Sequence, residues 1–167
     1  MRDIYIISDT HFGHENILKF TGFDGGPVRE FHDVHHMNEY MVERWNKTIK
    51  DNDIVYHLGD VYFGKGHQML SRLRGRKRLI LGNHDNGKSE HLLNNFEKIL
   101  MWRDFKEFDC ILSHVPLHES ALYKRKYNLH GHVHKGDHRG LMQDKRYINC
   151  CVEVRDYTPV HIEELVK

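Results

Sequence analysis

Short apolar runs that stop abruptly at polar residues recur along the first half of the chain. They cover residues 4–7, 54–58 and 79–81, and Ser or Gly follows each run directly. Runs of this length, rich in Ile, Val and Leu and bounded by turn residues, predict strands that are buried on both faces. We therefore expect strands over 4–7, 54–58 and 77–81.

Helical periodicity occupies the intervals between these strands. Asp33 is a candidate N-cap for a helix over 34–50, because apolar residues follow it at helical spacing. Those residues are Val34, Met37, Met41, Trp45 and Ile49. A second helix is expected over 65–73, and Ser89 can begin a short third one that reaches Asn95. Strands separated by helices predict parallel neighbours joined by right-handed crossovers.

The second half of the chain is richer in strand patterns than in helical ones. Candidate strands cover 97–102, 107–112, 127–129 and 147–154. These strands would form a second sheet that packs on the first. We expect a single domain over residues 1–167 with an α/β fold, a two-sheet β-sandwich of mixed strands flanked by helices in four layers.

Composition narrows the class of protein but not its chemistry. The chain has 167 residues, a formal net charge of +1 and 29% charged residues, which predicts no bulk attraction to nucleic acid or to an anionic membrane. Its three cysteines, two of them adjacent, do not suggest a disulfide framework. No apolar stretch approaches the length of a transmembrane helix. We expect a cytoplasmic protein with reduced, buried cysteines.

Residues with the chemistry of metal ligands follow five of the expected strands. They are Asp9 with His11, Asp60, Asn83 with His84 and Asp85, His114, and His132 with His134. An alternating pair on an extended backbone points both side chains to one side, so both could reach one centre. Without His84 and Asp85, the set is too large for one catalytic zinc and suits two metals that share a carboxylate. Nitrogen and oxygen ligands without thiolate favour Mn²⁺, Fe or Zn²⁺ over Ca²⁺.

These five blocks, in this order, resemble the signature blocks of the calcineurin-like metallophosphoesterases. They extend from residue 9 to residue 134, so the resemblance covers most of the chain. The opening block, Asp9 to His14, further resembles that of small phosphoesterases without a cap domain. The interval between His11 and Asp60 holds a Gly-rich loop and one helix. Since this leaves little chain for a cap, we expect an open site.

The resemblance implies a role for each residue of the blocks. The first metal would be held by Asp9, His11 and His134, the second by Asn83, His114 and His132, and Asp60 would bridge the two. His84 would not bind metal. It would stabilise the phosphoryl group or protonate the leaving oxygen, with Asp85 orienting its ring.

The predicted function is hydrolysis of phosphoesters, with diesters favoured over monoesters, by a water activated between two divalent metal ions. Mn²⁺ is the first candidate, and Zn²⁺, Fe and Ni²⁺ are alternatives. The substrate would be a phosphoester, nucleotide-like compounds included. One alternative is an interaction scaffold on the same fold without catalysis, which the presence of His84 disfavours. Another is a nuclease or cyclic-nucleotide phosphodiesterase. The oligomeric state is left open.

Three details of the site also stay open at this point. His14 lies three residues after His11 and could face either the metals or the solvent. The basic run from Lys124 through Arg125 to Lys126 lies between the last two blocks, where it could attract an anionic substrate or form a solvated face. Apart from the basic runs, no arginine is adjacent to the blocks in the sequence.

Overall fold

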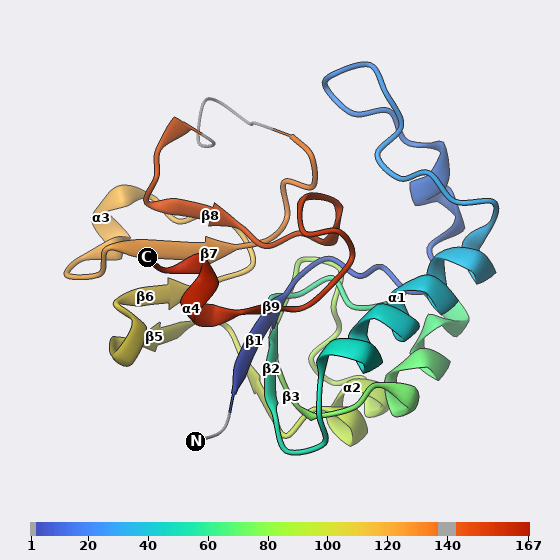
Figure 1. The fold of residues 1–167 in the computed structure, drawn as a ribbon, viewed down its shortest axis with the longest axis horizontal. Helices are drawn as coiled ribbons and strands as arrows, with labels where there is room; N and C mark the ends of the chain where they lie inside the picture. Colours follow the sequence, from blue (N-terminus) through green and yellow to red (C-terminus); the bar gives the residue numbers. More distant parts are fainter. Residues whose placement is uncertain (1–2, 137–142) are drawn as a thin grey trace.

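The computed structural model describes residues 3–136 and 143–167, and Figure 1 shows them as two sheets with helices at the sides. The first sheet has the strand order β4-β3-β2-β1-β9. Its strands are β1 (Ile4–Ile7), β2 (Ile54–His57), β3 (Arg76–Ile80), β4 (Lys98–Leu100) and β9 (Val160–His161). Strands β1 to β4 are parallel, and β9 pairs antiparallel with β1.

The second sheet has the order β5-β6-β7-β8. Its strands are β5 (Arg103–Phe105), β6 (Cys110–Leu112), β7 (Tyr127–His130) and β8 (Tyr147–Asn149). Strand β5 is antiparallel to β6, whereas β6, β7 and β8 are parallel. Both sheets are therefore mixed, as the sequence predicts.

Helices cover the outer face of the first sheet, and one short helix lies beside the second. Helices α1 (Val34–Thr48) and α2 (Glu90–Asn95) and the 3-10 helix η2 (Gly64–Arg72) lie on the first sheet, and the short α3 (Glu119–Leu122) lies beside the second (Figure 1). The other short helices are η1 (Glu15–Lys19), η3 (Lys106–Phe108), η5 (Val152–Val154) and α4 (Ile162–Leu165). The predicted fold class, two mixed sheets flanked by helices, is confirmed.

Two hydrophobic clusters hold the layers together, one on each face of the first sheet. Ile7, Val55 and Leu79 pack with the apolar side of the helices, which includes Met41 and Trp45 of α1. On the other face, alternate residues of the same strands pack against the second sheet. This inner cluster includes Ile6, Tyr56, Ile80, Leu112, Leu129 and Cys150. Because the strands of the first sheet are covered on both faces, they carry nearly continuous apolar runs.

The helix predicted over 34–50 forms over Val34–Thr48, and Asp33 accepts a hydrogen bond from the backbone N–H of His36 at its start. The segment over 65–73 is a 3-10 helix, not an α-helix. Ser89 precedes α2 without a side-chain capping bond, because its hydroxyl pairs with the Tyr62 hydroxyl. Periodicity alone does not separate these helix types.

Three expected strands are shorter than predicted. The run over 97–102 ends at Leu100, and the chain then crosses to the second sheet, where β5 begins. Residues 106–108 form a turn of 3-10 helix before the left-handed Asp109, so β6 begins only at Cys110. The run over 147–154 continues as a 3-10 helix after Asn149. Turns embedded in apolar runs cause all three differences.

Among the residues that the structure describes, no helix has both the length and the apolar character that crossing a membrane requires.

Candidate metal centre

The ligand-type residues gather where five strands end. Strands β1, β2 and β3 of the first sheet lead to Asp9, Asp60 and Asn83, and β6 and β7 of the second lead to His114 and to the block 132–134. A backbone hydrogen bond from Asp9 to the Gly59 carbonyl joins the first two of these ends. The carboxyl ends of parallel strands are where open α/β sheets place their ligands.

The backbone at five of the seven ligand-type residues is left-handed, not extended. The φ angles of Asp9, His11, Asp60, His132 and His134 lie between 49° and 70°. The expectation that the alternating pairs converge on an extended backbone is therefore wrong, and each side chain reaches the centre through a tight bend. Left-handed backbone is uncommon for residues other than glycine and is typical of functional sites.

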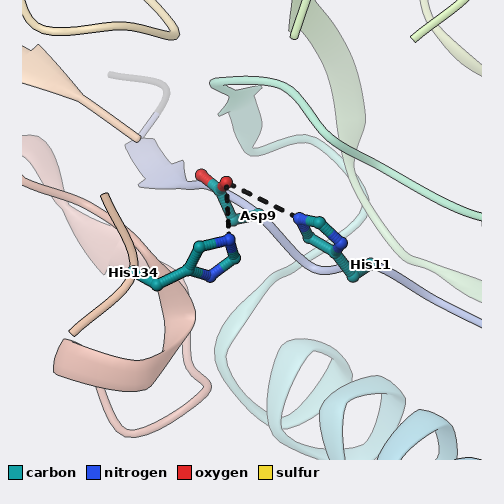
Figure 2. A group of neighbouring side chains, drawn as sticks. All are labelled: Asp9, His11 and His134. Carbon is teal, nitrogen blue, oxygen red and sulfur yellow. Dashed lines mark ion pairs between the residues drawn. The ribbon is translucent and has the colours of Figure 1, made fainter. Parts of the chain in front are cut away.

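The first cluster contains Asp9, His11 and His134, whose side chains face one another in Figure 2. Nε2 of His11 lies 3.7 Å from Oδ1 of Asp9, and Nε2 of His134 lies 3.8 Å from the same oxygen. Oδ1 of Asp9 and Nε2 of His11 are buried and have no hydrogen-bond partner. Buried polar atoms without partners are costly, and a bound cation would satisfy both.

The other oxygen of Asp9 is fully engaged by its neighbours. Oδ2 accepts hydrogen bonds from the Ser8 hydroxyl at 2.5 Å, the backbone N–H of His132 at 2.9 Å and the Cys151 thiol at 3.4 Å. Burial opposes ionisation of Asp9, but the nearby imidazoles of His11, His114 and His134 outweigh burial and lower its pKa. The carboxylate is therefore charged and has one oxygen free.

The second cluster contains Asp60, His114 and His132. Nε2 of His114 lies 3.5 Å from Oδ2 of Asp60. Oδ1 of Asn83 joins this group, 2.8 Å from Nε2 of His114 and 3.0 Å from Nδ1 of His132. Asn83 and His132 are exposed, whereas the first cluster is mostly buried. Solvent therefore reaches the centre from the second cluster.

Asp60 connects the two clusters. Its Oδ2 lies 3.6 Å from Nε2 of His11 and 3.5 Å from Nε2 of His114, so one oxygen faces a ligand from each cluster. Burial raises the pKa of Asp60, but the imidazoles of His11 and His114 and the backbone N–H of His84 outweigh burial and lower it. A charged carboxylate between two sets of imidazoles fits two divalent cations, and the donor set supports the predicted bridging position.

Two residues behind the first cluster are absent from the sequence prediction. The buried Glu153 carboxylate accepts a hydrogen bond from Nδ1 of His134, and its Oε1 also lies 2.8 Å from Nε of Arg29. Arg29 is 1% exposed and donates to the backbone carbonyls of Asp9 and Thr10. Although no arginine is adjacent to the blocks in the sequence, a buried arginine thus supports the first block in space.

His14 faces the site, which settles the question that the sequence leaves open. Its Nδ1 lies 3.0 Å from Nδ1 of His11, and its ring stacks on Phe63 with centroids 4.0 Å apart. Burial, together with the charges of His11 and other neighbours, lowers the pKa of His14 to about 4. A neutral His14 can therefore pair with the imidazole of His11 near neutral pH.

His84 lies at the exposed rim of the centre. Its backbone N–H donates to Oδ1 of Asp60 at 3.0 Å, and its ring centroid lies 6.2 Å from that of His11 and 5.2 Å from that of Phe63. It belongs to neither ligand cluster. This position leaves its imidazole free to meet a substrate.

Asp85 does not contact the His84 ring as the predicted role requires. Its carboxylate accepts hydrogen bonds from the backbone N–H groups of Asp60, Val61 and Gly82, at 2.8 to 3.0 Å. Among the described residues, no hydrogen bond joins Asp85 to the imidazole of His84. The carboxylate instead ties the loop after β3 to the loop after β2, because these loops present three amide donors to it.

Glycines allow the strand ends to approach so closely. A Cβ atom on Gly82 would lie 2.2 Å from Oδ1 of Asp60. A Cβ atom on Gly131 would lie 2.0 Å from the Ser8 hydroxyl and 2.2 Å from Oδ2 of Asp9. These glycines are therefore required for the packing of the ligands.

The basic run 124–126 lies at the start of β7, whereas the ligands follow its end. Arg125 pairs with Asp104 at 2.5 Å, and the ammonium groups of Lys124 and Lys126 lie over the rings of Tyr123 and Tyr127. The structure thus favours a solvated face over a border of the site.

No family model matches the chain. It is 34% identical to the uncharacterized protein MJ1445 of Methanocaldococcus jannaschii, over 100% of this chain and 91% of that protein. It is 25% identical to the Gene 66 protein of Mycobacterium phage D29, over 99% of this chain and 96% of that protein. The crystal structure of AQ665, a protein of unknown function from Aquifex aeolicus, aligns with a TM-score of 0.78 and 29% identity, over 99% of this chain and 98% of that one.

The similarity to MJ1445 and AQ665 extends over nearly the whole chain, so the common fold is that of the complete two-sheet architecture. Ligand clusters at the ends of strands from both sheets agree with the order of the five blocks in the sequence. The chain belongs to one family with MJ1445, and its fold is that of the metallophosphoesterases.

Proposed function

We propose that the protein is a metal-dependent phosphohydrolase that cleaves phosphoester bonds at this centre, with diesters preferred over monoesters. The observation that carries the proposal is the position of Asp60, whose Oδ2 lies within 3.6 Å of an imidazole from each cluster. The partnerless buried atoms of Asp9 and His11 support it. Two adjacent cation sites with a shared carboxylate are typical of phosphoester hydrolysis.

The chain offers a complete set of groups for two metal ions. Asp9, His11 and His134 would hold the first ion, Asn83, His114 and His132 the second, and Asp60 both. When bound, two divalent ions, Mn²⁺ before Zn²⁺, Fe or Ni²⁺, supply charge neutralisation for the phosphoryl oxygens and a water of lowered pKa. The second cluster would meet the substrate, because its exposed residues face the solvent.

His84 would act on the phosphoryl group itself. Its exposed imidazole, held near His11 through the backbone bond to Asp60, can donate a hydrogen bond to a phosphoryl oxygen or a proton to the leaving oxygen. The guanidinium group of Arg29 pairs with the Glu153 carboxylate, so it cannot neutralise a second negative charge on the substrate. The single negative charge of a diester suits such a site better than the two charges of a monoester.

Hydrolysis of bis-p-nitrophenyl phosphate and p-nitrophenyl phosphate with Mn²⁺, Ni²⁺ or Zn²⁺ tests the proposal. We expect His84→Ala to lower kcat/KM by about 100-fold, the usual effect of losing a general acid, with metal content unchanged. His118→Ala is the matched control, since His118 is an exposed histidine that caps α3. Metal binding without hydrolysis of either substrate would contradict the proposal and favour a non-catalytic scaffold.

A further inference from the structure

An apolar cleft of about 540 Å³ opens directly beside the second cluster. Its lining includes residues of the centre, Asn83 and His114 among them. The apolar part of the lining consists of Leu81, Met101, Trp102, Val115 and Leu117. A group bound in this cleft would therefore adjoin a phosphoryl group at the metal ligands.

Two residues in the crossing from β4 to β5 line the cleft and are unusually exposed. Met101 is 71% exposed and Trp102 is 57% exposed. Val115, on the neighbouring loop after β6, is also an exposed apolar residue of the cleft. Large apolar side chains that are exposed together, next to a polar centre, mark a binding surface.

The polar groups of the cleft are already engaged. The Ser113 hydroxyl donates to the carbonyl of Val115, and the Asp85 carboxylate accepts from backbone amides. Asn83 and His114 face each other within the second cluster. What the lining offers a ligand is the exposed indole of Trp102 and the thioether of Met101, and both favour contact with a flat aromatic ring.

We propose that this cleft binds the aromatic ring of a phosphodiester substrate, of the nucleobase or aryl kind, by stacking on Trp102. The inference rests on the proposed function in one respect: the phosphorus atom of the substrate is taken to lie at the metal ligands. Stacking on an indole tolerates different bases, since every base has a π-face. The substrate class is thus aromatic phosphodiesters, without selection for one base.

Calorimetric titration in Mn²⁺ with four probes tests this subsite: adenosine 5′-monophosphate, ribose 5-phosphate, octyl phosphate and inorganic phosphate. We expect adenosine 5′-monophosphate to bind about tenfold more tightly than ribose 5-phosphate, the gain from one stacking contact. Trp102→Ala should abolish this preference, and Trp102→Phe should retain most of it. Leu93→Ala, which removes a 55% exposed apolar side chain from α2, should change nothing.

Equal affinities for adenosine 5′-monophosphate and ribose 5-phosphate would overturn the inference, and so would an unchanged preference in Trp102→Ala. Octyl phosphate that binds as tightly as the nucleotide, with the same dependence on Trp102, would overturn the aromatic assignment. These outcomes are independent of hydrolysis. If the nucleotide preference is present but neither p-nitrophenyl substrate is cleaved, the proposed function fails and the subsite stands.

Discussion

Three of the ligand imidazoles have their second nitrogen occupied by a neighbour within the chain. Nδ1 of His11 contacts His14, Nδ1 of His134 contacts Glu153, and Nδ1 of His114 lies 2.8 Å from the Leu58 carbonyl. In each ring this leaves Nε2 directed to Asp9 or Asp60. Such outer contacts fix the orientation and basicity of metal-binding histidines.

At this scale we predict that Glu153→Gln weakens binding of Mn²⁺ by about 10–100-fold, the usual cost of losing an outer carboxylate partner. The amide keeps the shape of the side chain but loses the charge that faces His134 and Arg29. Isothermal calorimetry measures the affinity. Glu39→Gln, which removes an exposed partner of Arg72, is the control. An affinity equal to that of the wild type would show that Glu153 does not act through His134.

The residues of the blocks could be predicted because each follows a strand, and strand ends converge in this class of fold. Arg29 and Glu153 could not, because their contact joins residues 124 positions apart with no local pattern. The contacts of Asp85 differ from those that its predicted role requires, for a related reason. Adjacency to His84 suggests a side-chain pair, whereas the amides that Asp85 binds come mainly from another strand end.

At the scale of elements, the ends of β1 and β7 touch where Gly131 meets Ser8 and Asp9. The backbone N–H of Gly131 also donates to the His114 carbonyl, which joins the loop after β7 to that after β6. The two sheets therefore meet at Gly131, which directly precedes the ligand-type residue His132 in the chain.

We predict that Gly131→Ala lowers the free energy of unfolding by about 1–3 kcal/mol, because the added methyl group overpacks this contact. It should also reduce metal affinity, since Oδ2 of Asp9 would have to move. Urea denaturation gives the stability. Gly26→Ala is the matched control, because its Cβ atom would meet only the Asp24 side chain, at 3.5 Å or more. If Gly131→Ala were as stable as Gly26→Ala, the proposed close packing of Gly131 against Ser8 and Asp9 would be contradicted.

The long apolar runs of β1, β2 and β3 could be predicted because burial on both faces leaves a clear pattern. The edge strands β5 and β9 are absent from the prediction, because two of the three residues of β5 are charged and β9 has only two residues. Tertiary pairing, of β9 with β1 and of β5 with β6, decides their conformation.

At the scale of the molecule, the metal centre joins the two sheets. Asp9, Asp60 and Asn83 come from ends of the first sheet, and the ligand histidines after β6 and β7 come from the second. Ions at the centre would therefore act as cross-links between the two halves of the sandwich.

We predict that Mn²⁺ at about 100 times its dissociation constant stabilises the protein by about 2.7 kcal/mol. For a chain of this size, the melting temperature should rise by about 5–10 °C relative to protein in EDTA. Differential scanning calorimetry measures the shift. Asp60→Asn should lose most of it, because this variant lacks the charge shared by both clusters. The same melting temperature with and without Mn²⁺ would contradict the prediction that the two clusters bind metal ions.

The spread of the ligands along the chain has a consequence for how the protein acquires its metal. Asp9 is synthesised long before His134 and its partner Glu153, which follow it far along the chain. A nascent chain on the ribosome thus carries part of the donor set with no pocket to shape it. Geometry and ion supply, more than ligand type, decide which metal a nitrogen and oxygen site takes. The identity of a metal bound at this centre would therefore be decided by the ions that the folded protein meets after synthesis.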